Sequence, residues 1–195
     1  MNIKQQKQIK TFLKEEFGED RGIEIFSKQE KKLDELIKNT KDKSKKQMKV
    51  LFQTILPRIA LYKVLMDEGF LRENVYQYMR KYMIDKIATK KHSSMVKMEM
   101  VPGFFPIYKN IFLKIMRKTD LQESVQSAGS DYFDVTIKKC LWHTACVENN
   151  CEELCSIFCD VDDVTYGGLR KIGFTRTKTL GYGGDCCDFH LYRKK

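Results

Sequence analysis

The sequence predicts an α+β fold, in which a helical N-terminal half packs on a small antiparallel β-sheet formed by the C-terminal third. Two apolar patterns, one in each part of the chain, support this prediction. Apolar residues recur at helical spacing through most of residues 1–120, whereas from Ser130 onward they alternate with polar residues, as in half-buried strands. A length of 195 residues with 42% hydrophobic residues fits a single domain, 1–195, with a core of its own.

Glycine and proline divide the helical half. Gly18 ends the first apolar stripe, and Gly69 ends the strongest helical pattern. Pro57 lies inside that pattern, and because proline donates no backbone hydrogen bond it must kink the helix or divide it in two. Further helices are predicted over about 72–88 and 107–116.

The sheet region, 130–195, contains three predicted strands, centred on residues 133–137, 174–180 and 187–191. Glycines between the last two strands indicate an antiparallel hairpin, and we expect them to permit positive φ in a tight turn. These glycines are Gly181, Gly183 and Gly184. Strand residues follow them, so the loop does not meet the context of a dinucleotide-binding motif, which requires a helix at that point.

Composition limits the expected location and partners. No stretch approaches the ~18 apolar residues that span a membrane, and the start lacks the apolar core of a secretory signal, so we expect a cytoplasmic protein without a membrane partner. Seven cysteines in that setting indicate reduced thiols rather than a disulfide framework. A net charge of +10 would suit nucleic acid. However, lysines mix with acidic residues over the helical half and no reading motif accompanies them, so no nucleic-acid partner is predicted.

Thiols and carboxylates gather in the sheet region. Cys140 ends the first predicted strand, Cys159-Asp160-x-Asp162 follows a short helix predicted over 152–158, and Cys187-Asp188 opens the last strand. The aspartates after Cys159 could cap the next segment or serve acid–base chemistry. This pattern suggests a thiol–carboxylate site.

Other cysteines and the histidines carry weaker signals. Cys151 and Cys155 share a helical stripe with Cys159, and we expect them to pack as small hydrophobic residues. His143 follows Cys140 by three residues and would share a face with it only in a helix. His190 alternates with Phe189 and is expected to face away from Cys187.

Several spaced elements of the sheet region resemble the L-2-amino-thiazoline-4-carboxylic acid hydrolase family, over about residues 50–193. The run Pro57-Arg-Ile-Ala-Leu-Tyr62 with the later Gly69 is similar to the helical segment of that family. The elements that carry the resemblance are the strand ending in Cys140, Cys159-Asp160-x-Asp162, Phe174-Thr-Arg-Thr-Lys-Thr-Leu180, Gly183 and Cys187-Asp188-Phe189.

The resemblance implies a hydrolase that opens a small cyclic substrate of the C–N/C–S type to a carbamoyl amino acid. Such a reaction needs a nucleophile or a base for water, and a proton donor for the ring. The candidate catalytic residues are Cys140, Cys159, Asp162, Cys187 and Asp188. Arg176 is the candidate for the substrate carboxylate, and Gly183 for substrate contact. No cofactor is expected, and zinc held by the cysteines is the alternative.

The final hairpin supports a second interpretation. Its glycine-then-cysteine ending is similar to small-molecule-binding domains of the 4-vinyl reductase type, which would make the chain a binding module without catalysis. Cys186 and Cys187 are adjacent and face opposite sides of a strand, so the reactive thiol decides on which face the site lies.

Overall fold

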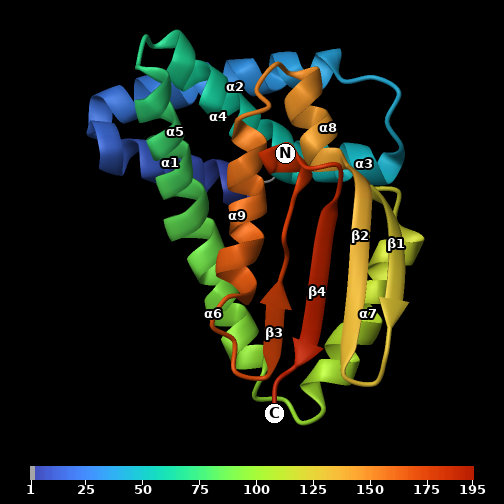
Figure 1. The fold of residues 1–195 in the computed structure, drawn as a ribbon. Coiled ribbons are helices and arrows are strands. Elements are labelled where there is room, and N and C mark those ends of the chain that lie inside the picture. Colours follow the sequence, from blue (N-terminus) through green and yellow to red (C-terminus); the bar gives the residue numbers. More distant parts are fainter. Residues whose placement is uncertain (1–2) are drawn as a thin grey trace. The chain divides into compact units, whose positions relative to one another are not determined.

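The computed structural model describes residues 3–195 and confirms the α+β fold class (Figure 1). Two compact units can be distinguished: the chain up to Tyr82 with Ala145–Leu154, and Met83–Thr144 with Cys155–Lys195. The single-domain organisation remains a prediction. Among the described residues, no helix is both long and apolar enough to cross a membrane.

The first unit is helical, and its glycine residues act as the sequence predicted. Gly18 (φ 83°) follows α1, and Gly69 (φ 81°) follows α4. Pro57 is the second residue of α4 and comes directly after a π-helical segment, so the chain remains helical from Lys45 to Asp67 and changes its helix type just before the proline. The helices are α1 (Ile3–Phe17), α2 (Glu19–Asn39), α3 (Lys45–Val50), the π-helix Leu51–Ile55, α4 (Leu56–Asp67) and α5 (Arg72–Lys81).

The second unit contains a four-stranded antiparallel sheet in the order β1-β2-β4-β3. In Figure 1, α7 runs behind the sheet and α9 runs beside β3. The strands are β1 (Gln122–Ala128), β2 (Tyr132–Cys140), β3 (Ile172–Thr175) and β4 (Cys187–Arg193), with a 3-10 turn at Leu180–Tyr182. The remaining helices of the chain are the π-helix Tyr82–Ala88, α6 (Thr89–Met98), α7 (Phe104–Lys118), α8 (Leu141–Glu148) and α9 (Leu154–Tyr166).

One predicted strand needs correction, and one strand was not predicted. The strand predicted over 174–180 ends at Thr175, and the residues after it form a loop whose backbone N–H groups donate hydrogen bonds to the Asp188 carboxylate on β4. Strand β1 was not predicted, because it is an edge strand whose one large apolar side chain, Val125, is exposed. Its register shifts between Glu123 and Ser124.

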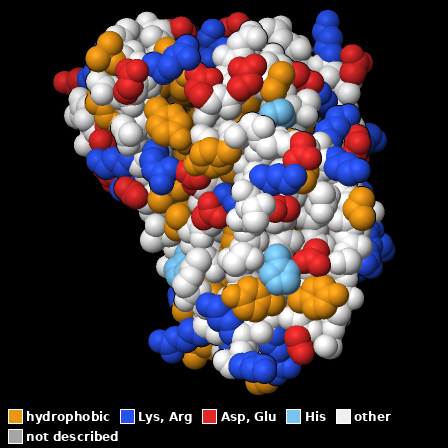
Figure 2. All heavy atoms as spheres, in the orientation of Figure 1, with side chains coloured by type: hydrophobic (Ala, Val, Ile, Leu, Met, Phe, Trp, Pro, Cys, Tyr) orange, Lys and Arg blue, Asp and Glu red, His pale blue; other side chains and the backbone are white. Residues whose placement is uncertain are grey.

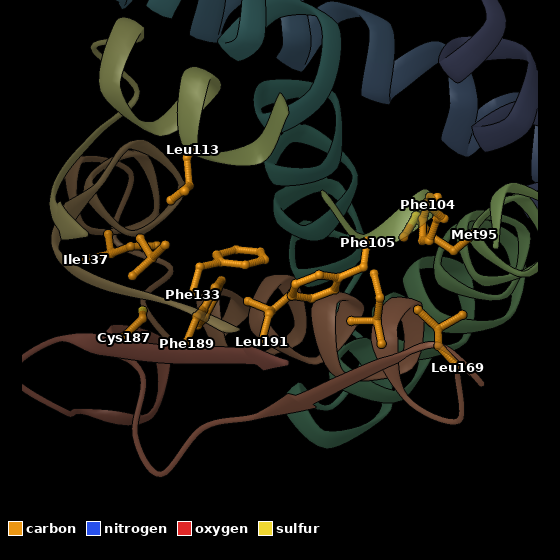
Figure 3. Close-up of a cluster of buried hydrophobic side chains, with 12 residues drawn as sticks. Met95, Phe104, Phe105, Leu113, Phe133, Ile137, Leu169, Cys187, Phe189 and Leu191 are labelled. Carbon is orange, nitrogen blue, oxygen red and sulfur yellow. The ribbon is translucent and has the colours of Figure 1, made fainter. Parts of the chain in front are cut away.

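One face of the sheet forms the core of the second unit. Phe133 on β2 and alternate residues of β4 form a core cluster with side chains of α7, among them Phe105 and Leu113. Figure 3 shows Cys187, Phe189 and Leu191 pointing from β4 into this core. The thiol of Cys187 is therefore fixed on the inner face by the same period-2 pattern that buries its neighbours.

The opposite face of the sheet is open. His190 pairs there with Asp134 across the strands and stacks between Tyr132 and Tyr192, at centroid distances of 6.1 and 5.3 Å. Figure 2 shows a histidine beside two aromatic rings on this face. The prediction that His190 faces away from Cys187 is confirmed.

A buried carboxylate fixes the start of β3. Glu99, just beyond α6, accepts hydrogen bonds from the backbone N–H groups of Arg170 (2.9 Å), Lys171 (2.7 Å) and Ile172 (3.1 Å). Its carboxylate thereby satisfies three consecutive backbone donors at the start of β3, of which that of Ile172 is buried. This contact positions the strand that leads to Arg176.

Candidate functional site

The candidate site is built on one face of α9. Cys155, Cys159, Asp162 and Tyr166 are spaced by four, three and four residues, so they lie along a single side of the helix. This helix begins and ends later than the predicted 152–158. Asp160, Asp162 and Asp163 therefore lie within it, and the interpretation of these residues as caps of the next segment is wrong.

The thiols of Cys159 and Cys187 lie against the same turn, because Leu180 N donates a hydrogen bond to Cys187 Sγ (3.4 Å) and a Cβ atom on Gly181 would lie 2.7 Å from Cys159 Sγ. Hydrogen bonds from the thiols of Cys155 and Cys187 lower the pKa of Cys159, against burial, and the hydroxyl of Thr179 and the charge of Arg176 lower it further. Donation to Cys159, together with burial, raises the pKa of Cys187. These interactions favour loss of the first proton from Cys159, which receives the additional donors, and retention of the second on Cys187.

Arg176 brings a buried positive charge to this pair. Its side chain is 8% exposed, forms an ion pair with Asp163, and lies 5.9 Å from the ring centroids of Phe174 and Phe189. Within the described part of the chain, its buried Nη1 atom has no hydrogen-bond partner. A buried guanidinium nitrogen without a partner is costly, so the group is suited to receive an anionic ligand.

Asp162 supplies an acid–base group with a shifted pKa. Its pKa is raised to about 7, chiefly by burial; the positive charges of Lys91 and Arg176 oppose the rise, and Cys159 and Asp163 contribute to it. Asp162 as a whole residue is partly exposed to solvent, although its carboxyl group is surrounded by many protein atoms. A carboxyl group of this kind can exchange protons near neutral pH.

Cys140 also belongs to this neighbourhood. Its pKa is raised to about 11, chiefly by burial, although hydrogen bonds from the backbone N–H groups of His143 and Trp142 oppose the rise. The charges of Cys159 and Asp162 also act on it. Cys140 is the last residue of β2 and His143 lies in α8, which begins at Leu141, so the two residues do not share a helix. The contact with Cys140 is made by the backbone N–H group of His143.

The structure places Asp188 away from the thiols. Adjacent residues of a strand face opposite sides of the sheet, and the Asp188 carboxylate accepts hydrogen bonds from Thr177 N (3.0 Å) and Lys178 N (2.8 Å) and from the Thr177 hydroxyl. Although partial burial opposes the shift, these bonds hold the pKa of Asp188 below its usual range. Asp188 therefore shapes the loop after Arg176.

The glycine loop has a different role from the one predicted. Gly183 has φ 78°, as expected for a turn, but Gly181 and Gly184 do not adopt positive φ. A Cβ atom on Gly181 would lie 2.7 Å from Cys159 Sγ and 2.9 Å from the Cys155 carbonyl. The absence of a side chain at Gly181 thus lets the 3-10 turn approach the thiol directly.

Three residues of the site were not predicted: Lys91, Thr179 and Gly181. Nothing local in the sequence marks them, because each approaches α9 from a distant part of the chain. Cys155 had been interpreted as a core residue, and it is both buried and a hydrogen-bond donor to Cys159. Over residues 3–195, no group of three or more His, Cys, Asp or Glu side chains has the arrangement of a metal site.

Comparison with known proteins gives one match. The family model described as L-2-amino-thiazoline-4-carboxylic acid hydrolase matches residues 47–191, which include every residue of the candidate site. No curated protein and no solved structure matches the chain.

Proposed function

Because the chain belongs to the L-2-amino-thiazoline-4-carboxylic acid hydrolase family, we propose that it hydrolyses a small cyclic amidine that carries a carboxylate. One observation carries the proposal: a thiolate, a carboxyl group that titrates near neutrality and a buried arginine with a free donor are brought together around Cys159. These are the groups that such a ring opening requires.

Arg176 is assigned to the substrate carboxylate. Its Nη2 atom is held by Asp163, whereas Nη1 is buried and unpaired among the described residues. A carboxylate hydrogen-bonded to Nη1 would satisfy this donor and neutralise part of the guanidinium charge. This contact would orient the ring with its amidine carbon towards Cys159.

Cys159 is assigned as the nucleophile. Its thiolate attacks the ring carbon between nitrogen and sulfur, and the tetrahedral adduct collapses with cleavage of the carbon–sulfur bond of the ring. The substrate thiolate leaves that carbon and takes a proton from Asp162. The product of this step is an isothiourea that links Cys159 to the opened substrate.

Water completes the reaction. Asp162, now ionised, removes a proton from water, which adds to the isothiourea carbon. Collapse of this second adduct expels the Cys159 thiolate and leaves a urea group on the amino acid, a carbamoyl product. One water is consumed, and the enzyme regains its starting protonation state.

The test is a ring-opening assay with 2-amino-thiazoline-4-carboxylate as substrate, followed by trapping of the released thiol. We expect thiol release by the purified protein and its loss in Cys159→Ala and Asp162→Asn. Cys146→Ala, which changes a buried cysteine of the first unit, is the matched control and should retain activity. Binding of the acid in a thermal-shift experiment without thiol release would overturn catalysis and favour the binding-module interpretation.

A further inference from the structure

Three thiols from two elements meet at the candidate site. Cys155 and Cys159 lie one turn apart on α9, and Cys187 is the first residue of β4. Leu180 N donates a hydrogen bond to Cys187 Sγ (3.4 Å), and a Cβ atom on the next residue, Gly181, would lie 2.7 Å from Cys159 Sγ. The thiols of Cys159 and Cys187 therefore meet at the same turn, and none of the three cysteines is in a disulfide. Cys159 is the partly exposed member of the cluster, whereas Cys155 and Cys187 are buried.

We propose that Cys159 is an oxidation site with Cys187 as its resolving partner, so that a hydroperoxide closes the site reversibly through a Cys159–Cys187 disulfide. The formation of this bond rests on the approach of both thiols to the Leu180–Gly181 turn. Its effect on turnover rests on the proposed function, because it removes the nucleophile assigned there.

The chemistry proceeds in two steps. The Cys159 thiolate attacks the hydroperoxide, the oxygen–oxygen bond breaks, and with one proton the products are a sulfenic acid and an alcohol, or water when the oxidant is hydrogen peroxide. The Cys187 thiol then attacks the sulfenic sulfur and releases water. Two equivalents of an external thiol reverse the reaction and are themselves oxidised to a disulfide.

The fold favours Cys187 over Cys155 as the partner. Residues one turn apart on a helix have Cβ atoms about 5–6 Å apart, whereas a disulfide requires about 3.5–4.5 Å. A bond between Cys155 and Cys159 would therefore distort α9. Cys187 approaches from a separate strand, so side-chain movement can bring its sulfur to the bonding distance.

Peptide mapping without reduction tests the proposal directly. Trypsin leaves Cys159 in the peptide 140–170 and Cys187 in the peptide 179–193, so a link between the two elements joins two peptides, whereas a bond within α9 stays inside one. After treatment with hydrogen peroxide and alkylation, we expect the joined peptides in the native protein, and their separation after dithiothreitol. The link should be lost in Cys187→Ala and Cys159→Ala.

Cys186→Ala is the matched control, since it changes the neighbouring cysteine in the same tryptic peptide, and it should retain the link. A link that persists in Cys187→Ala, a bond confined to the peptide 140–170, or over-oxidation of Cys159 without a disulfide would overturn the proposal. If the joined peptides form but ring opening is unaffected, the oxidation site stands and the nucleophilic role of Cys159 is refuted. Loss and recovery of activity in step with the link supports both.

Discussion

Substitution of Arg176 by lysine tests how the site recognises its substrate. Lysine keeps the positive charge and can keep the ion pair with Asp163, but it cannot present the second guanidinium nitrogen. A hydrogen bond between that buried nitrogen and a carboxylate is worth about 1.5–3 kcal/mol. Since about 1.4 kcal/mol corresponds to a factor of ten, we expect kcat/KM for the carboxylate substrate to fall about 10- to 150-fold.

The assay compares two substrates, 2-amino-thiazoline-4-carboxylate and its carboxamide, by the rate of thiol release. The native protein should prefer the acid by about the same 10- to 150-fold factor, because the carboxamide lacks the charge that Nη1 would bind. Arg176→Lys should lose this preference mainly through a slower reaction of the acid. Arg170→Lys changes an exposed arginine of the same unit and is the matched control.

Equal losses on both substrates would refute the reasoning, because they would show that Arg176 acts on the reacting groups or on the fold and does not read the carboxylate. Thermal unfolding of Arg176→Lys separates the last two cases. A preference for the acid that survives unchanged in the variant would also contradict the assignment.

Four further outcomes can be measured. Because the raised pKa of Asp162, about 7, lies above its unfolded value of about 4, the free energy of unfolding should fall as pH rises from about 4 to about 7, and Asp162→Asn should flatten this decline. At pH 8 the variant should gain at most about 4 kcal/mol in the free energy of unfolding measured with urea, less the screening that partial exposure allows. A pH profile unchanged by the substitution would contradict this prediction. Gly181→Ala places a methyl group 2.7 Å from Cys159 Sγ and should reduce the rate of ring opening at least ~10-fold. The control Gly168→Ala, at a position with φ 72° and open surroundings, should cost only about 1–2 kcal/mol of stability and retain activity. Similar activities of the two variants would refute the close approach of Gly181 to Cys159. Glu99→Gln turns an amide donor towards backbone N–H groups and should lower the free energy of unfolding, measured with urea, by about 2–4 kcal/mol. A loss below about 0.5 kcal/mol would show that these backbone donors find other partners. Metal analysis of the purified protein should give well below one zinc per chain, and stoichiometric zinc would reassign the thiols as ligands.

The sequence predicted elements whose apolar period is strong. The helices broken at Gly18 and Gly69, and the strands around Phe133 and Phe189, follow directly from spacing. It did not predict β1, because an exposed edge strand needs no alternating apolar face. The segment after Thr175 alternates like a strand, but the Asp188 carboxylate captures its backbone N–H groups and turns it into a loop.

The site was predictable only in part. Cys159, Asp162 and Arg176 could be proposed from residue type and family resemblance, and the structure brings them together. The separation of Asp188 from Cys187 follows from the period of a strand and was available from sequence. The approach of Gly181 to Cys159 was not, because it depends on how a distant turn packs on α9.

The two edges of the sheet affect how the protein behaves at high concentration. An exposed edge strand offers a row of unpaired amides on which another chain can assemble, and this is a route to fibrils. Here one edge, β3, extends only over Ile172–Thr175, and the other, β1, is polar, has an irregular register near Glu123 and carries the Glu123–Lys139 ion pair. Neither edge gives an incoming strand a long, flat, apolar template, so concentrated solutions of this cysteine-rich chain should resist cross-β aggregation as long as the sheet stays folded.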